Sequence, residues 1–400
     1  MIRHLFTLMW NRKRANGLLT LEIFLAFVVL FAVGSVGVYY YRNYRAPLGF
    51  AYDHVWQISL SPGTQPRPEQ FNTLQQVLAR LRSTPGVVSV SRSVDNTPFA
   101  FSINSGNVAT GEGPAARQTD ESDFYDAGPE LRDVMGLRLR EGRWFDHRDE
   151  TPGRYPPVVL TEATRAALFP GGQPAVGQIV RFGFKGTEPF RVIGVSGPYR
   201  AGGELSEPRP GLFRYVSPQD TARALFKLLV RVQPGAGAAL EKKIGDDIRA
   251  TNPLWHSSVD YLSEMRIAQL KVKLVPPAIL GVVCLFLIVN VALGLFGVLW
   301  LNINQRRAEL GVRRALGASA GAISGQVVGE ILVLTTFGLG LGLLVAAQFP
   351  LLGVLNVQPG IYLTAMGLAA AALYLLATAC ALYPSRLAAG VRPAVALREE

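Results

Sequence analysis

Four arginines lie close together in the segment RRAELGVRRALGAS, residues 306–319, between two long apolar stretches. A guanidinium group stays charged at physiological pH and can donate two parallel hydrogen bonds to one carboxylate. If residues 305–318 form a helix, Glu309 and Arg313 make a favourable ion pair, and Gly317 can end the helix in the left-handed conformation. The segment therefore predicts a short, charged, amphipathic helix that either anchors to lipid headgroups or docks on another protein.

Acidic side chains and a histidine gather in one further stretch, WFDHRDE at residues 144–150. Carboxylates and imidazoles can bind a metal ion, but no two of His54, His147 and His256 stand at metal-ligand spacing. A solvated loop is the favoured interpretation of residues 144–150, and a metal site is the alternative. We find no catalytic constellation in the segment between the first two apolar stretches.

The composition, 49% hydrophobic and 17% charged, is apolar for a soluble protein and too mixed for a wholly embedded one. Several stretches have the ~20 apolar residues that a helix needs to cross a bilayer. They cover residues 18–41, 274–303, 323–349 and 361–383. The first is too long for the apolar core of a signal peptide, so we expect a permanent membrane helix.

Basic residues predict the orientation, because cytoplasmic segments carry an excess of Lys and Arg. Segments 1–17, 304–322 and 384–400 are basic and are expected in the cytoplasm, whereas the short segment 350–360 has no charge. Residues 42–273 then form a large domain outside the cytoplasm. These topology signals carry much of the net charge of +11, so we expect no nucleic-acid partner.

The expected outer domain alternates strand and helix patterns, separated by Gly and Pro. Strand patterns cover residues 54–62, 87–94, 190–197 and 225–234. Residues 155–169 predict a strand that runs into a helix capped by Thr161. Amphipathic helices are predicted before Pro85–Gly86 and before Asn252–Pro253. The predicted fold class is therefore a four-helix membrane protein with a large α/β extracytoplasmic domain inserted between the first and second membrane helices.

The sequence predicts an outer domain that has no disulfide framework and contains one loop rich in glycine and proline. Both cysteines, Cys284 and Cys380, fall inside apolar stretches, so no disulfide framework is expected and the domain must rely on its own core. Residues 197–211, GPYRAGGELSEPRPG, are rich in Gly and Pro and predict a flexible surface loop, with contact to a partner as the alternative.

Two glutamates interrupt the apolar stretches, and a charge is costly in lipid. Glu330 should face protein or water, with a proton relay as the less favoured role, and Glu22 lies near the cytoplasmic boundary and can reach out of the membrane. Pairs of glycines at four-residue spacing predict close helix contacts, either within the chain or between two copies. These pairs are Gly325 with Gly329, and Gly338 with Gly342.

The segment QRRAELGVRRALGAS resembles the loop between the second and third helices of the FtsX/MacB family of ABC-transporter permeases, which has the form R-R-x-E-[IL]-G-[IV]-R-[RK]-A-[LIV]-G-A. The C-terminal YPSRLAAGVRPAVALREE is similar to the same family's ending. The stretches VVLTEATRAALFPGGQPAVGQIVRFG and FRVIGVSG are similar to a MacB-type periplasmic core. The resemblance thus covers nearly the whole chain, and its most specific part is the arginine-rich loop.

This resemblance implies that the loop couples the permease to a cytoplasmic ABC ATPase dimer. By residue match the coupling role falls on Arg306, Arg307, Glu309, Leu310, Gly311, Arg313, Arg314, Ala315, Leu316 and Gly317. In the resembling families a Glu often stands near Glu330, which implies a packing or coupling role. No G-x-x-x-x-G-K-[ST] motif occurs, so we expect no cofactor and no enzymatic activity in this chain, with ATP and Mg²⁺ bound by a separate partner subunit.

The implied function is mechanotransmission in a bacterial inner membrane, in which ATP binding by the partner moves the outer domain. Export of a small molecule or peptide is favoured, with a periplasmic adaptor and an outer-membrane channel as further partners. Lipoprotein extraction, and signalling or control of a cell-wall hydrolase, are the alternatives. A second permease copy or a related permease is expected as partner. A membrane-anchored scaffold or receptor without an ATPase is the alternative outside the ABC family.

Overall fold

The computed structural model describes residues 13–93, 96–111, 116–151, 153–183, 188–217, 226–353 and 357–389. The chain divides into two compact units. One is Asn43–Lys273, which we call the outer unit. The other combines Met1–Arg42 with Leu274–Glu400, and we call it the membrane unit.

Four helices in the described part of the chain are long and apolar enough to cross a membrane. They are α2 (Lys13–Arg45), α7 (Leu262–Gln305), α9 (Ala320–Ala346) and α11 (Pro359–Ala389). The helix α7 begins before the expected stretch 274–303 and continues through Pro276 and Pro277 without a break. A short helix, α10 (Gln348–Leu351), follows α9.

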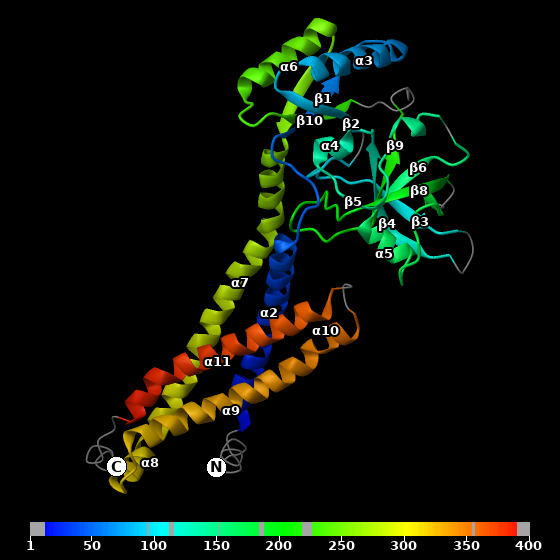
Figure 1. The fold of residues 1–400 in the computed structure, drawn as a ribbon. Helices are drawn as coiled ribbons and strands as arrows, with labels where there is room; N and C mark the ends of the chain where they lie inside the picture. The colour runs from blue at the N-terminus through cyan, green and yellow to red at the C-terminus, as the bar shows by residue number, and fades with distance from the viewer. Residues whose placement is uncertain are drawn as a thin grey trace. The chain divides into compact units, whose positions relative to one another are not determined.

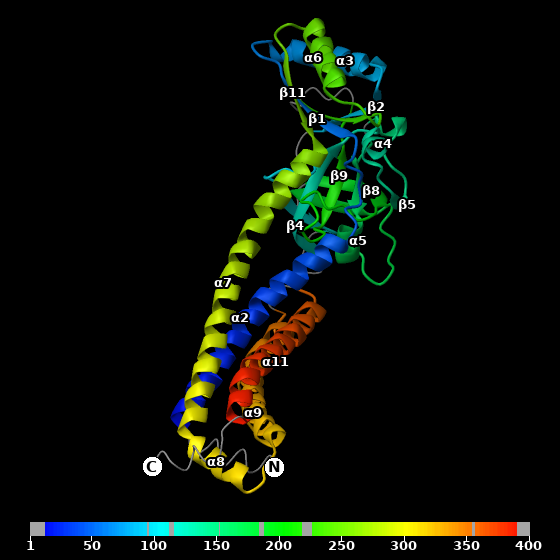
Figure 2. The same cartoon turned by 90° about the vertical axis from the view of Figure 1, so that its left-hand side faces the viewer.

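The membrane unit has its own apolar core, which includes Phe27, Leu295 and Leu334. Helices α9 and α11 lie side by side in both views (Figures 1 and 2). Large apolar side chains also point outward, among them Leu285 at 62% and Leu375 at 72% exposure. Helices that are apolar on all sides suit a lipid surrounding, because the surface that does not pack on protein contacts hydrocarbon.

The outer unit contains an 11-stranded sheet among its described residues. Six of the strands form a closed ring in the order β4–β3–β7–β8–β6–β9, because β9 also pairs with β4. Their bounds are β3 (Ser105–Ala109), β4 (Gln118–Ala127), β6 (Pro157–Thr161), β7 (Ile179–Gly183), β8 (Glu188–Ser196) and β9 (Gly211–Tyr215). A closed ring leaves no strand edge unpaired. We call these six strands the barrel.

The other strands extend and flank the barrel. The antiparallel order β11–β1–β10–β2 joins the barrel where Ser93 pairs with Ala127 of β4. These strands are β1 (Val55–Ser61), β2 (Val87–Ser93), β10 (Lys227–Val232) and β11 (His256–Tyr261). The short β5 (Leu139–Gly142) pairs with β8.

Two amphipathic helices pack together over the strands β11–β1–β10–β2 (Figure 1). They are α3 (Arg67–Ser83) and α6 (Ala238–Thr251). Leu78 and Ile244 are both buried in the core that the helices share with Ile58 of β1. Trp255 is fully buried there and donates its indole N–H to Gln65. Every third or fourth residue of each helix is apolar, which explains why one face of each is buried.

The predicted α/β class and the predicted strands are confirmed, and so is the cap of α5 (Glu162–Leu168) by Thr161. The prediction for residues 197–211 was wrong. Tyr199 and Arg200 in this stretch are 4% and 2% exposed, so a large part of it is core rather than a flexible surface loop. A buried arginine requires hydrogen-bond partners from elsewhere in the chain, and the composition of the stretch does not reveal them.

Candidate functional site

The arginine-rich loop forms α8 (Arg307–Ala315), which follows directly after α7. The backbone of Arg306 leaves the helical conformation and separates α8 from α7, so the predicted helix 305–318 is shorter than expected. Gly317 has a φ of +94° and ends the turn, as its position predicted. Ala318 then donates its backbone N–H to the carbonyl of Arg313 at 3.0 Å.

One side of α8 packs on the rest of the membrane unit, and the other side, which we call its open side, is exposed. Leu310 is 3% exposed and lies in the apolar core of that unit together with Ile303 and Ile323. Leu316, at the end of α8, is 83% exposed. The side chain of Arg307 lies outside the described residues. Helix α8 is therefore anchored through Leu310 and presents Leu316 to its surroundings.

Five polar side chains form a closed ring between α8 and α9. Arg306 contacts Glu309 at 3.0 Å and Glu330 at 3.0 Å, and Arg313 contacts Glu309 at 2.7 Å. Arg313 also donates to Gln326 at 2.8 Å, and Gln326 donates to Glu330 at 3.0 Å. The predicted Glu309–Arg313 pair is thus one side of a larger network, which we call the α8–α9 ring.

The α8–α9 ring explains why a carboxylate is tolerated at position 330. The Arg306 side chain is 14% exposed, and a charge at that depth is stable only when it is paired and hydrogen-bonded. Hydrogen bonding to Glu309, followed by the charge of Glu330, raises the pKa of Arg306, although burial opposes this. Gln326 was missed in the sequence, but its spacing of four residues before Glu330 on one helix was the available signal.

Arg314 lies outside the ring. Its guanidinium approaches the carbonyl of Ala318 at 3.5 Å, and the side chain is half-buried. Gly311 is buried, whereas Ala315 is exposed. The predicted coupling residues whose side chains are described therefore divide into those that hold α8 in place and those that are exposed.

Glu22 is half-buried in the membrane unit, and its reach out of the membrane stays a prediction. Its carboxylate occupies the space beside Gly294 of α7, where a Cβ atom would overlap with both of its oxygens. Glycine at position 294 therefore gives the carboxylate room between α2 and α7.

The two glycine pairs of α9 differ in their surroundings. A Cβ at Gly338 would lie 2.7 Å from a methyl carbon of Ile23, and a Cβ at Gly342 would overlap with the ring of Phe27. Both of these glycines pack against α2 within the chain. A Cβ at Gly325 or Gly329 would meet no described atom within 4 Å. Close packing within the chain therefore explains only the second pair.

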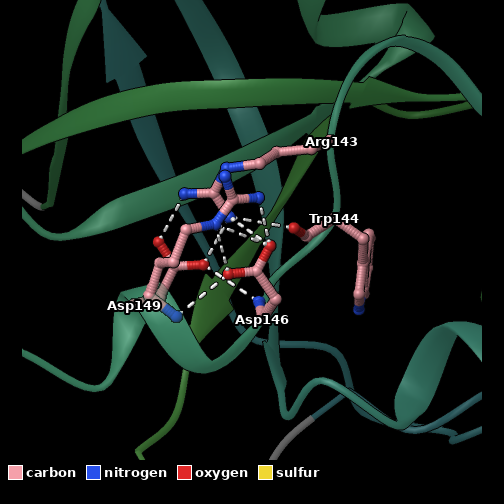
Figure 3. Close-up of polar contacts among 5 residues, drawn as sticks. Arg143, Trp144, Asp146 and Asp149 are labelled. Atoms are coloured by element: carbon pink, nitrogen blue, oxygen red, sulfur yellow. Dashed lines mark hydrogen bonds and ion pairs between the residues drawn. The ribbon is translucent and has the colours of Figure 1, made fainter.

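The acidic stretch at residues 144–150 is an arginine-paired loop (Figure 3). Arg143 donates to both carboxylate oxygens of Asp149 at 2.6 and 2.7 Å. Asp146 caps the short helix η1 (His147–Asp149) and accepts from the side chain and backbone of Arg148. The hydrogen bonds from the side chain of Arg148, and to a smaller extent the one from its backbone N–H, hold the pKa of Asp146 well below its usual range. Among the described residues, no group of three or more His, Cys, Asp or Glu could hold a metal ion.

Two families match the chain. The family described as MacB-like periplasmic core domain matches residues 17–246, and the family described as FtsX-like permease C-terminal matches residues 281–391. The first match spans most of α2 and most of the outer unit, and the second spans most of α7 and all of α8, α9 and α11.

Several known proteins are similar over part of their length. The macrolide export ATP-binding/permease protein MacB 1/2 of Paracoccus denitrificans is 28% identical over 56% of this chain and 33% of its own length. The protein MacB of Shewanella oneidensis, which carries the same description, is 25% identical over 80% of this chain and 48% of its own length. The chain therefore spans less than half of each of these two relatives.

A solved structure, the periplasmic region of MacB from Actinobacillus actinomycetemcomitans, aligns with 54% of this chain and 92% of its own. Its TM-score is 0.37 and its sequence identity is 18%. The family matches carry the assignment, since the first alone covers more than half of the 400 residues. With its four apolar helices and its extracytoplasmic domain, the chain belongs to the FtsX/MacB-type family of ABC transporter permeases.

Proposed function

We propose that this chain is the transmembrane subunit of an ABC transporter and transmits ATP-driven motion of a separate ATPase to the outer unit. The α8–α9 ring supports this proposal most directly. Arg306 and Arg313 attach α8 to α9 on one side, and Leu316 is exposed on the other. A partner that binds the exposed side can therefore displace α8, and the ring passes the displacement to α9. Surface anchoring to lipid would not require the ring.

The proposed mechanism is a rigid-body transmission. Closure of the cytoplasmic ATPase dimer displaces α8, and the Arg306–Glu330 contact carries this displacement to α9. Helix α7 ends one residue before Arg306 and extends unbroken from Leu262, which directly follows β11. A movement of α8 can therefore reach the strands of the outer unit along one continuous helix.

The setting of this mechanism is the inner membrane of a bacterium, with both chain termini and α8 in the cytoplasm. ATP and Mg²⁺ are bound by the partner subunit, and this chain is not itself an enzyme. Two permease copies, or this chain and a related permease, pair in the assembly. We favour export of a small molecule or peptide, with a periplasmic adaptor and an outer-membrane channel, because the relatives named above are described as macrolide export proteins.

Lipoprotein extraction, signalling and control of a cell-wall hydrolase use the same transmission and differ in what the outer unit acts on. A scaffold or receptor without an ATPase is the competing proposal of a different class. Recovery of an ATPase with this chain separates the two classes, and identification of further partners separates the pathways.

The test is mild extraction of the tagged chain from its native membrane, followed by mass spectrometry of bound proteins. We expect a stoichiometric ABC ATPase with the parent chain and its loss from an Arg314→Glu/Leu316→Asp variant, which alters the open side of α8 and leaves the α8–α9 ring intact. Arg386→Glu, a reversal of charge at an exposed residue near the end of α11, is the control. Absence of an ATPase from the parent under several mild conditions would refute the proposal.

A further inference from the structure

The strongest unexplained feature lies in residues 198–206, which connect the end of β8 to the start of β9. Arg200 is at the centre of this segment and is 2% exposed. A buried guanidinium is stable only if its donors are satisfied. Five hydrogen bonds of this guanidinium go to the backbone carbonyl groups of Asn43, Ala46, Glu204 and Ser206.

One of these carbonyl groups belongs to Asn43 in the last turn of α2, and another belongs to Ala46, directly after the helix. The Nη1 atom of Arg200 donates to Asn43 at 2.8 Å and to Ala46 at 2.9 Å. The last carbonyl groups of a helix have no partner within the helix and carry partial negative charge. Arg200 therefore caps α2 from a position more than 150 residues later in the chain. Its backbone N–H donates to Leu48 at 3.0 Å and extends the same contact.

The same segment also holds the first part of α7. Arg266 forms an ion pair with Glu204, and Lys273 donates to the carbonyl of Gly202 and to the hydroxyl of Ser206. Arg266 and Lys273 are seven residues apart, so they lie on one face of the helix. Segment 198–206 thus contacts both helices at the points where they enter the outer unit.

The third attachment is to the barrel. Tyr199 is 4% exposed and its ring lies 4.7 Å from that of Tyr125 in β4 and 5.0 Å from that of Phe213 in β9. Gly49, which has a φ of +86°, packs so closely on Pro198 that a Cβ atom would overlap with its carbonyl oxygen. The segment is therefore fastened to the aromatic core as well as to the chain that leaves α2.

We infer that residues 198–206 are the joint of the outer unit, and that Arg200 is the positioning residue that ties the end of α2 to the start of α7 and to the barrel. This inference deepens the proposed function, since the joint is the route by which movement of the two helices becomes movement of the barrel. It also explains how a segment so rich in glycine can be buried. The carbonyl groups of residues 202, 204 and 206 accept hydrogen bonds from Lys273 and Arg200, so they have partners inside the outer unit.

The first stage of the test uses the full chain in lipid nanodiscs without nucleotide. Arg200→Gln and Lys273→Met are compared with the parent by hydrogen–deuterium exchange. We expect amide exchange in residues 43–50 and 198–206 to rise about tenfold in Arg200→Gln, because a buried capping group is lost. Arg209→Gln is the matched control, since this arginine lies just beyond the joint and pairs with the exposed Glu121. Unchanged exchange in Arg200→Gln would overturn the inference, with or without an ATPase partner.

The second stage adds the ATPase recovered with the parent chain. Lys273→Met should keep ATPase binding and hydrolysis and lose the nucleotide-dependent change in barrel exchange, whereas Lys273→Arg should retain it. Variants that transmit as the parent does would overturn the role of the joint. If instead the parent binds no ATPase, the proposed function fails, and the first stage alone decides whether the joint exists. If Arg200→Gln does not fold, Lys273→Met, which removes donors from an incompletely buried site, carries both stages.

Discussion

Arg306 and Glu330 are joined by an ion pair of 3.0 Å that links the break after α7 to the first half of α9. Twenty-three residues separate them in the chain, and α8 lies between them. Three further polar residues, Glu309, Arg313 and Gln326, close the contact into the α8–α9 ring. The position of α8 is thus determined by paired charges as well as by the burial of Leu310.

We predict that Glu330→Gln loosens α8. The substitution keeps the size of the side chain but leaves Arg306 with only one of its two carboxylates, which should cost about 1.5–3 kcal/mol. Amide exchange in α8 should therefore rise by at least about tenfold in native-state hydrogen exchange. Glu22→Gln is the matched control, because it removes a carboxylate of the same unit that lies outside the ring. Equal exchange in the two variants would show that the ring does not hold α8.

We predict that alanine at Gly338 or Gly342 destabilises the membrane unit, since the new methyl group would overlap with Ile23 or Phe27. Overpacking of this kind costs about 1–3 kcal/mol. The thermal unfolding midpoint of the chain in detergent should fall accordingly.

Gly325→Ala and Gly329→Ala are the matched controls on the same helix, because their added methyl groups meet no described atom. Both should unfold as the parent does. Alanine favours a helix more than glycine does, so a loss of stability of the same size in these variants would show that contact with α2 is not what requires glycine on α9.

The sequence predicted the elements whose burial is periodic and missed those whose burial depends on distant partners. The helix α3 and the strand β10 have regular apolar patterns, and both were found. Strand β4, QTDESDFYDA, resembles a solvated loop, yet Asp123 and Asp126 in it are 3% and 2% exposed. Asp126 is buried because Arg214, 88 residues later, pairs with it at 2.8 Å.

The same limit applies to the candidate site and to the joint. The arginine-rich loop could be recognised because its residues are contiguous. Gln326 completes the α8–α9 ring from the next helix, and Arg200 finds its acceptors at the end of α2. A polar residue that is buried by such contacts has no local pattern, since its partners are brought to it by the fold.

We predict that Thr161→Val destabilises the barrel. The Thr161 hydroxyl accepts the backbone N–H of Thr164 at the start of α5 and that of Gly211 at the start of β9. Loss of an N-cap costs about 0.5–2 kcal/mol, and Thr161 is 1% exposed, so no water can replace the bond. Urea unfolding followed by tryptophan fluorescence should show a lower midpoint for Thr161→Val and a nearly unchanged one for Thr161→Ser. Equal midpoints for the two variants would contradict the capping role.

We predict that the loop at residues 143–150 weakens in acid through Asp146. Hydrogen bonds from Arg148 lower the pKa of this carboxyl in the folded chain. A lowered pKa means that the folded state favours the ionised form, so the stabilisation is complete above the ordinary carboxyl pKa of about 4 and is lost as the pH falls below it. Asp146→Asn removes this dependence, because the amide does not titrate.

Proteolytic nicking of the loop at pH 7 and at lower pH measures the effect, with peptide mapping to locate the cleavage. Asp146→Asn should be cleaved faster than the parent at pH 7, and the difference should shrink once the parent carboxyl is protonated, since both side chains are then neutral. Glu150→Gln is the control, because Glu150 is exposed and the hydrogen bonds of Asp146 come from Arg148. A difference between parent and Asp146→Asn that stays constant across this pH range would show that the carboxylate charge does not stabilise the loop.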